Sequence, residues 1–308
     1  MKKDKIFSKY LHYCPVCGNY VVKPWFTKDY AGLQFKVDKC CACGSGYINP
    51  QPPEEYLQSL YSCIGHGSKS FTSLKDVIAS EAEFPNSTVD AKRMVTYAKK
   101  VLGTKKEDYW KALDIGSGYG LFSRAALDQG FKVVAVNPAI TENSIFKELN
   151  GFDPIPLFFE EIDFGDEKFD LVILSQVLEH ILDPLEVLIK VRNLLEPGGV
   201  VAIAVPNVDA ILIKILKSKS TFLGLPEHLF HFSRRGLGAI LQRAGLNMIH
   251  HVYYSRIPYF TLSNKFNLHG ISRKSMNLFV KVLQWPPLLL ANLFGYGLYQ
   301  NVWAIRIQ

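Results

Sequence analysis

The sequence predicts an α/β fold built on a doubly wound, mostly parallel sheet, with a small cysteine-rich ribbon before it. Two observations predict the sheet: short apolar runs alternate with helix-length segments from Lys111 onward, and a glycine-rich turn directly follows the first run. Four cysteines in two pairs predict the ribbon. With 308 residues and 48% hydrophobic content, the chain can bury one large core and carry a small appendage.

The cysteine pairs lie in two short turns, each with a glycine directly after its second cysteine. "CPVCG" contains Cys14 and Cys17, and "CCACG" contains Cys40 and Cys43. Four thiolates at this spacing converge tetrahedrally on one zinc ion, and such a closed site stabilises a fold without offering a position to a substrate. Residues 21–39, between the pairs, supply two short strands. The pattern therefore predicts a zinc ribbon with a structural metal.

Two alternatives remain for these cysteines. Cys41 could replace Cys40 as a ligand, although it stands one residue too close to Cys43 for the usual turn. Two disulfides would also satisfy four cysteines. The chain begins with basic residues and has no apolar run behind them long enough for a signal peptide, so we expect a cytoplasmic protein with reduced thiols.

The expected order of the parts is a ribbon over residues 1–52, a helical linker or cap over 53–105, and a large domain over 106–308. Prolines end the ribbon. A helical pattern covers residues 89–102 and ends at Gly103. The glycine- and serine-rich segment before this helix is a candidate cover over a site.

In the large domain, four apolar runs with little alternation read as strands that are buried on both faces of a parallel sheet. They are residues 112–115, 132–136, 169–175 and 199–206. A helical pattern covers 184–195, before an "EPGG" turn. Ligands of such sheets bind beyond the carboxyl ends of the strands.

The glycine turn "LDIGSGYG" opens a helix directly after the first strand. Gly116 and Gly118 allow turn dihedrals and a close approach of ligand to backbone, and the helix start offers N–H groups. The turn matches neither a phosphate-binding loop with Lys-Ser/Thr nor the full G-x-G-x-x-G spacing. On its own, it does not name the ligand.

Three sequence blocks, taken in their order along the chain, resemble those of a known enzyme family. The glycine turn is followed by residues 169–207, with "LEH", "DP" and "LEPGG", and by residues 225–246, with "HLFHFS". Together they resemble class I S-adenosylmethionine-dependent methyltransferases, some of which carry an N-terminal zinc ribbon and act on sugars or other small molecules. The resemblance implies a Rossmann-like fold whose antiparallel last strand, residues 299–308, pairs with 245–254.

The resemblance also implies the residues that bind S-adenosylmethionine. The glycine turn would contact the methionine part. In the strand order of the family, which counts a further strand before Glu160, Glu160 or Glu161 would follow the third strand and lie near the adenine, and the residues after the fourth strand, here 169–175, would line the sulfonium side. The implied set is Asp114, Gly116, Ser117, Gly118, Asn137, Glu160, Ser175, Gln176 and Leu178.

Asn137 departs from the family pattern, because an acidic residue usually stands at the end of the second strand and accepts hydrogen bonds from the ribose. An asparagine can still accept through its carbonyl oxygen, but the charge-assisted contribution of about 1 kcal/mol or more is lost. We therefore expect weaker binding of the cofactor.

Methyl transfer is an in-line displacement that requires alignment and, for a hydroxyl acceptor, removal of a proton. His228 and His231 lie in the block that resembles the acceptor-side loop, and His180 is a third candidate base. We favour His228, with packing of the loop as its alternative role; Glu179 either orients backbone or acts directly. Sugar C-methyltransferases tend to have a tyrosine where this chain has Leu225, which favours oxygen over carbon methylation.

The positive charge is concentrated at the end of the chain. The net charge is +7, and nine lysines and arginines but no acidic residue follow Glu227. This favours a phosphorylated partner or an anionic membrane surface, or else a solvated basic face. Residues 209–220 read as a small amphipathic helix. Residues 282–305 lack charge but contain prolines and glycines, so we expect an apolar insertion at about 257–296, which forms an acceptor lid or a shallow membrane contact.

The sequence thus predicts a cytoplasmic, or membrane-associated, O-methyltransferase for a small, glycosidic, nucleotide-linked or lipid-linked acceptor. One alternative is an RNA methyltransferase, because some such enzymes join a zinc finger to this fold; however, "SQVLEH" stands where a base-flipping "NPPY" motif would be expected. Another is a non-catalytic adaptor whose cofactor site is weakened at Asn137. Nucleic acid is the less expected partner, because the basic residues are interleaved with apolar ones.

Overall fold

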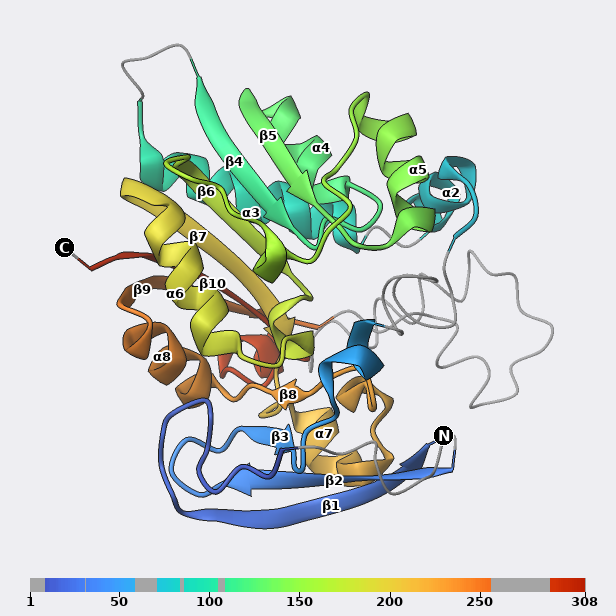
Figure 1. Cartoon of the computed structure of the whole chain (residues 1–308), viewed down its shortest axis with the longest axis vertical. Helices are drawn as coiled ribbons and strands as arrows, with labels where there is room; N and C mark the ends of the chain where they lie inside the picture. Colours follow the sequence, from blue (N-terminus) through green and yellow to red (C-terminus); the bar gives the residue numbers. More distant parts are fainter. Residues whose placement is uncertain are drawn as a thin grey trace.

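The computed structural model describes residues 9–30, 32–58, 71–83, 86–104, 109–255 and 289–307. A six-stranded sheet, in the order β5-β4-β6-β7-β10-β9, forms the centre of the molecule, and a four-stranded sheet lies at one end of it (Figure 1). The large sheet is the doubly wound, mostly parallel sheet that the sequence predicts.

The parallel part of the sheet is buried on both faces. Leu113, Val172 and Leu174 point to the face that is covered by α6 and α8, while Leu171 and Ile173 pack against α3 and α4 on the other face. This two-sided burial explains why the strands lack an alternating pattern. The strands are β4 (Trp110–Ile115), β5 (Phe131–Val136), β6 (Phe169–Ser175) and β7 (Leu195–Pro206).

The helices begin and end where their sequences supply caps. The oxygen of Asp183 accepts the Glu186 N–H at the start of α6, and the Ser233 hydroxyl accepts the Gly236 N–H at the start of α8. Gly103, at φ 73°, ends α3 as predicted. The helices are α2 (Leu74–Glu83), α3 (Ser87–Leu102), α4 (Leu121–Asp128), α5 (Ile140–Asn150), α6 (Pro184–Leu194), α7 (Ile211–Leu216) and α8 (Arg234–Arg243).

The antiparallel end of the sheet pairs as predicted. Strand β10 (Tyr299–Arg306) lies between β7 and β9 (Leu246–Tyr254). A buried polar group fastens α3 to these strands: Asp90 accepts hydrogen bonds from the Tyr254 hydroxyl at 2.6 Å and the Asn301 amide at 2.7 Å. Removing Asp90 would remove the acceptor of both hydrogen bonds.

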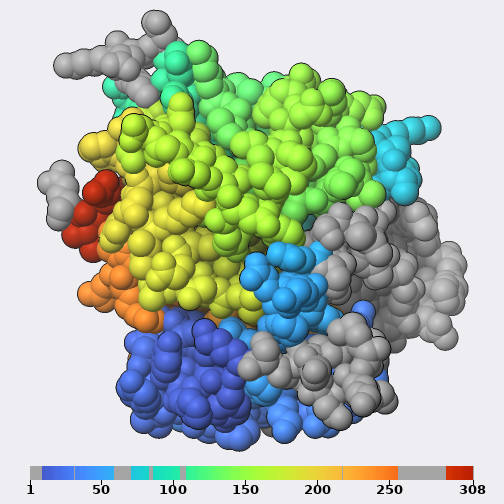
Figure 2. Space-filling model, in the orientation of Figure 1, coloured from blue at the N-terminus to red at the C-terminus, as the bar shows by residue number. Residues whose placement is uncertain are grey.

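The small sheet is the ribbon, and it includes a strand that the sequence did not predict. The ribbon strands β1 (Val22–Tyr30), β2 (Leu33–Cys40) and β3 (Gly46–Ile48) are followed in the sheet by β8 (Phe230–His231), which comes from the large domain. The Ser233 hydroxyl also donates to the Cys43 carbonyl oxygen at 2.5 Å. The space-filling view shows the ribbon, in blue, directly against the large domain (Figure 2). The ribbon is therefore completed by the domain it precedes.

Three expectations need revision or lie outside the described residues. The strand expected before Glu160 is a single parallel bridge between Val136 and Ile155. The helix expected over 209–220 is helical only at Ile211–Leu216, followed by a 3-10 turn. Most of the insertion at about 257–296 lies outside the described residues. Within the described part, no helix is long and apolar enough to cross a membrane.

Candidate active site

The glycine turn lies at the carboxyl ends of β4 and β5. The N–H groups of Gly116 and Ser117 both donate to the Val136 carbonyl oxygen, at 2.8 and 3.1 Å. Gly116 has φ 64°, and a Cβ there would lie 2.5 Å from a methyl group of Val177. Only glycine fits this position. The turn is thus fixed between the end of β5 and the segment after β6.

Two polar residues at this turn are buried: Asp114, near the end of β4, and Ser117, within the turn. The Asp114 carboxylate accepts the Ser123 hydroxyl at 2.6 Å, and burial raises the pKa of Asp114 to about 7. The hydroxyl oxygen of Ser117 is buried and has no hydrogen-bond partner among the described residues. A ligand with a cationic group would stabilise the Asp114 carboxylate, and a polar ligand would satisfy Ser117.

At the end of β5, Asn137 is buried, and its amide nitrogen is engaged within the protein. This nitrogen donates to a carboxylate oxygen of Glu142 at 3.2 Å and to the side-chain oxygen of Asn143 at 2.9 Å. Glu142 is 4% exposed, on the first turn of α5. Sequence reasoning did not select Glu142, although it is the first acidic residue after Asn137.

The segment after β6 begins with an unusual backbone. Gln176 has φ 58° and is the sole non-glycine residue with positive φ in the described part of the chain. Its N–H donates to the Ala204 carbonyl oxygen at 2.8 Å, which holds this conformation. Such a conformation costs about 1–3 kcal/mol and is concentrated at functional sites. Ser175 precedes it at the end of β6, and Leu178 beyond it is fully buried.

Glu160 and Glu161 belong to a 3-10 turn, Phe159–Glu161, and both are exposed. The Glu161 carboxylate accepts the Phe158 N–H at 3.1 Å, so it caps this turn. The predicted contact of Glu160 with the adenine stays a prediction.

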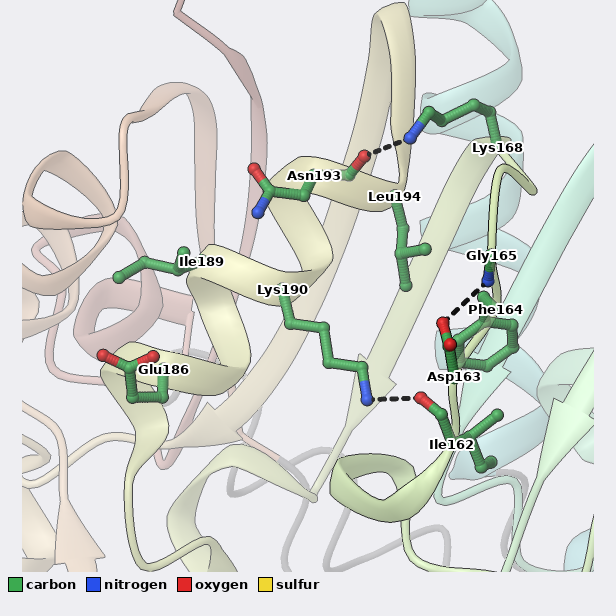
Figure 3. Close-up of a pocket in the computed structure, with 10 residues that line it drawn as sticks. All are labelled: Ile162, Asp163, Phe164, Gly165, Lys168, Glu186, Ile189, Lys190, Asn193 and Leu194. Carbon is green, nitrogen blue, oxygen red and sulfur yellow. Dashed lines mark hydrogen bonds between the residues drawn. The ribbon is translucent and has the colours of Figure 1, made fainter.

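Beside this turn, a pocket of about 310 Å³ lies between α6 and the loop that leads into β6 (Figure 3). Its central cation is Lys190, which donates to the carbonyl oxygens of Ile162 at 2.6 Å and Phe159 at 2.7 Å. Lys190 thus fastens the loop to α6. The loop enters β6 at the amino end of that strand, whereas the glycine turn follows the carboxyl end of the parallel strand β4. The pocket is distinct from the glycine turn.

Two of the three candidate histidines lie side by side. The rings of His180 and His228 are edge to face, with centroids 4.8 Å apart. His180 Nδ1 lies 3.0 Å from the Glu227 carbonyl oxygen. Because a carbonyl only accepts, Nδ1 carries the proton in the neutral ring, and Nε2 holds the lone pair. His180 is thereby fixed in one tautomer next to His228.

Glu179 completes this group. One ligand atom from each of Glu179, His180 and His228 lies within 4.8 Å of the others, so the three can share a proton or an ion. Glu179 is fully buried, its carboxylate oxygens have no hydrogen-bond partner among the described residues, and burial raises its pKa to about 8. Its backbone oxygen accepts the Leu229 N–H at 2.8 Å. Glu179 therefore fastens the acceptor-side loop and places a proton-binding group beside the histidines.

His228 and His231 occupy different surroundings. His228 is half-buried, and its ring packs so closely on Gly224 that a Cβ there would lie 2.5 Å away. His231 is buried in the ribbon sheet, edge to face with Trp25, and burial lowers its pKa to about 3. His231 therefore remains neutral and serves packing in the ribbon. His228 thus lies beside Glu179 and His180, whereas His231 packs on Trp25, and the role of His228 as the base stays a prediction.

The four predicted metal ligands come together in the ribbon. The sulfurs of Cys14 and Cys43 are 3.8 Å apart, and those of Cys17 and Cys40 are 3.6 Å apart. Sulfurs at about 2.3 Å from one zinc ion lie about 3.8 Å from one another at the corners of a tetrahedron, whereas a disulfide bond is about 2.05 Å long. The spacing fits a metal and not two disulfides. Cys41 is exposed and outside the group.

Comparison with known proteins agrees with this geometry. The family model described as "Methyltransferase domain" matches residues 89–251, which is more than half of the chain. The chain belongs to the methyltransferase domain family. It is a class I S-adenosylmethionine-dependent methyltransferase, as the resemblance implied.

Relatives and solved structures of this methyltransferase support the same family. A ubiquinone biosynthesis O-methyltransferase from Haemophilus ducreyi is 26% identical over 136 residues, which cover 40% of this chain and 58% of that protein. One from Cereibacter sphaeroides is 34% identical over 102 residues, 32% of this chain and 41% of that protein. The matches thus span about half the length of these relatives. A structure described as a methyltransferase from Bacillus halodurans C-125 shares the fold, with a TM-score of 0.50, 12% identity, and coverage of 70% of this chain and 99% of that one.

The predicted cofactor residues of this methyltransferase gather at one edge of its sheet. Asp114 and the glycine turn follow β4, Asn137 follows β5, and Ser175, Gln176 and Leu178 end or follow β6. S-adenosylmethionine supplies a methyl group on a sulfonium, which needs no further activation. The individual contacts with the cofactor stay predictions, because they were carried over from the family.

Proposed function

We propose that this methyltransferase transfers the methyl group of S-adenosylmethionine to a hydroxyl oxygen of a small or glycosidic acceptor, and that His228 removes the hydroxyl proton. The observation that carries the proposal is the group formed by Glu179 and His180, which follow β6, and by His228, which comes from the loop before β8. Residues that follow β6 are predicted to lie on the sulfonium side.

Each residue of the site has a separate proposed role. Asp114 and the glycine turn hold the cofactor, and Leu178 forms an apolar wall that excludes water. His228 takes the proton of the acceptor hydroxyl as the oxygen attacks the methyl carbon. His180, fixed by the Glu227 carbonyl, positions the His228 ring. A positive charge on His228 would favour the carboxylate form of Glu179, so we propose that the proton is shared between the buried Glu179 and the half-buried His228.

Two features support oxygen as the methylated atom. Leu225 stands where related sugar C-methyltransferases tend to have a tyrosine, and the two relatives described above are named O-methyltransferases. The basic charge after Glu227 favours an acceptor with a phosphate, nucleotide or lipid phosphate group.

In the same proposal the four cysteines hold a structural zinc ion, since their sulfur spacing matches a zinc tetrahedron.

The activity is tested with S-adenosylmethionine that carries an isotopically labelled methyl group. The protein is incubated with phenolic acceptors, sugar nucleotides, lipid-linked sugars or RNA, and release of S-adenosylhomocysteine is measured. We expect turnover with a hydroxyl acceptor and little change between low and moderate salt. Turnover with RNA alone, falling steeply with salt, would replace this proposal with the RNA alternative. Failure to bind the cofactor at all would favour the adaptor.

We also propose that the basic C-terminal part makes a peripheral contact with anionic lipid. Apolar side chains are exposed on α7 and on the segment 289–294, with Ile215, Leu293 and Phe294 each 71% exposed. The start of α7 contacts the chain just after this segment, because the Ile211 N–H donates to the Tyr296 carbonyl oxygen at 3.2 Å. No acidic residue follows Glu227 to oppose the contact.

Vesicle sedimentation tests this contact. We expect the protein to sediment with vesicles of anionic phospholipid and not with vesicles of neutral phosphatidylcholine. The double variant Leu293→Ser/Phe294→Ser should remain in the supernatant with its methyltransferase activity unchanged. Equal sedimentation of the wild type with both vesicle types, or of the double variant with anionic vesicles, would rule the contact out.

A further inference from the structure

The end of β5 carries an amide where a ribose-binding carboxylate is expected, yet a carboxylate is present at the same place. In dinucleotide-binding sheets an acidic residue at the end of the second strand accepts hydrogen bonds from ribose hydroxyls. Here Asn137 takes that position, and the carboxylate of Glu142 lies 3.2 Å from its amide nitrogen. Glu142 reaches this point from the first turn of α5 rather than from the strand.

The surroundings of Glu142 place its carboxylate at the glycine turn. A Cβ built on Gly118 would lie 3.8 Å from a carboxylate oxygen of Glu142, and apart from Gly118 and its two chain neighbours no other described residue has a heavy atom within 4 Å of that Cβ. Gly118 has φ 51°, a conformation that favours glycine, and because glycine has no side chain only its backbone faces the Glu142 carboxylate here. The Glu142 carboxylate therefore lies directly beside the backbone of the turn at Gly118.

We propose that Glu142 is the residue that binds the ribose hydroxyls of the cofactor, and that Asn137 is a positioning residue that holds the Glu142 carboxylate in place. The inference rests on the proposed function, because it assigns a role within the S-adenosylmethionine site. The amide hydrogens of Asn137 are committed to Glu142 and Asn143, which leaves its carbonyl oxygen as a further acceptor. The acid missing from β5 has thus been replaced by one on the following helix.

This arrangement reverses the expectation for an acid at position 137. Asn137→Asp would remove both donated hydrogen bonds and place a second carboxylate beside that of Glu142. Like charges at this distance repel. The substitution should therefore weaken cofactor binding, whereas the sequence pattern alone predicts that an acid at this position tightens it.

The test is calorimetric titration with S-adenosylhomocysteine and with its 2′,3′-dideoxy analogue, which lacks the ribose hydroxyls. The wild type should prefer the natural compound by about tenfold to a hundredfold, the range for charge-assisted hydrogen bonds. Glu142→Gln should lose most of this preference by weakening only the natural compound. Glu148→Gln, an exposed glutamate on the same helix, is the matched control and should bind like the wild type.

Two further variants test the role of Glu142 independently of Glu142→Gln alone. Asn137→Asp/Glu142→Gln moves the carboxylate back to the strand and should restore the preference for hydroxyls that Glu142→Gln loses. If Glu142→Gln does not fold, Asn137→Asp alone decides, because tighter binding in that variant contradicts the inference. Wild-type protein that binds neither compound would overturn the proposed function itself. Wild-type binding with an unchanged preference in Glu142→Gln would overturn only the role of Glu142.

Discussion

Replacing Cys40 by serine should release the metal from the ribbon and lower methyl transfer by about a hundredfold, the scale of loss that follows from a 1 Å misplacement of a reacting group. The physical reason is the sheet that the ribbon shares with the large domain. Strand β8 pairs with β3, and the acceptor-side loop that carries His228 leads directly into it. A ribbon that unfolds without its metal therefore removes one support of the proposed base.

The prediction is checked by measuring bound zinc, methyl transfer and affinity for S-adenosylhomocysteine in the same preparation. The affinity should change much less than the rate, because the glycine turn follows β4, which belongs to the large sheet, whereas the loop that carries His228 leads into the ribbon sheet. Cys41→Ser is the matched control, since Cys41 is exposed and outside the sulfur group. Full activity of metal-free Cys40→Ser would show that the acceptor-side loop does not depend on the ribbon.

His228→Asn should lower kcat by about a hundredfold to ten-thousandfold, which is the usual contribution of a positioned general base. Asparagine keeps a polar side chain of similar size but cannot take up a proton at neutral pH. His228 is proposed to contact the acceptor hydroxyl and not the cofactor, so the affinity for S-adenosylhomocysteine should stay within about twofold of the wild type.

The measurement is a single-turnover rate with saturating cofactor, together with calorimetry. His12→Asn, which replaces an exposed histidine in the ribbon, is the control and should leave both quantities unchanged. A His228→Asn variant with normal kcat would assign His228 to packing of the loop on Gly224, the alternative role considered from the sequence.

The sequence was sufficient to predict those elements that depend on residues close together along the chain. The parallel strands could be predicted because burial on both faces leaves uninterrupted apolar runs, and the ends of α3 and α6 because Gly103 and Asp183 act as caps. The four metal ligands could be predicted because two short turns fix the spacing within each pair.

The parts that could not be predicted depend on contacts between distant residues. Strand β8 has two residues, too few for a periodic pattern, and its partner Gly46 lies far away in the sequence. Glu142 escaped notice because its position in the site depends on how the first turn of α5 is oriented toward Gly118. The orphaned carboxylate of Glu179 is likewise a property of burial and not of its motif.

The shared strand β8 also bears on how such a protein can be assembled from parts during evolution. Phe230, in this strand, and Phe232, two residues later, are almost fully buried, and the edge of β8 pairs with the ribbon. A large domain that lost the ribbon would expose an unpaired strand edge and two aromatic side chains, a combination that promotes aggregation. We therefore expect that an exchange of ribbons between relatives succeeds only where the edge of β3 that pairs with β8 is preserved.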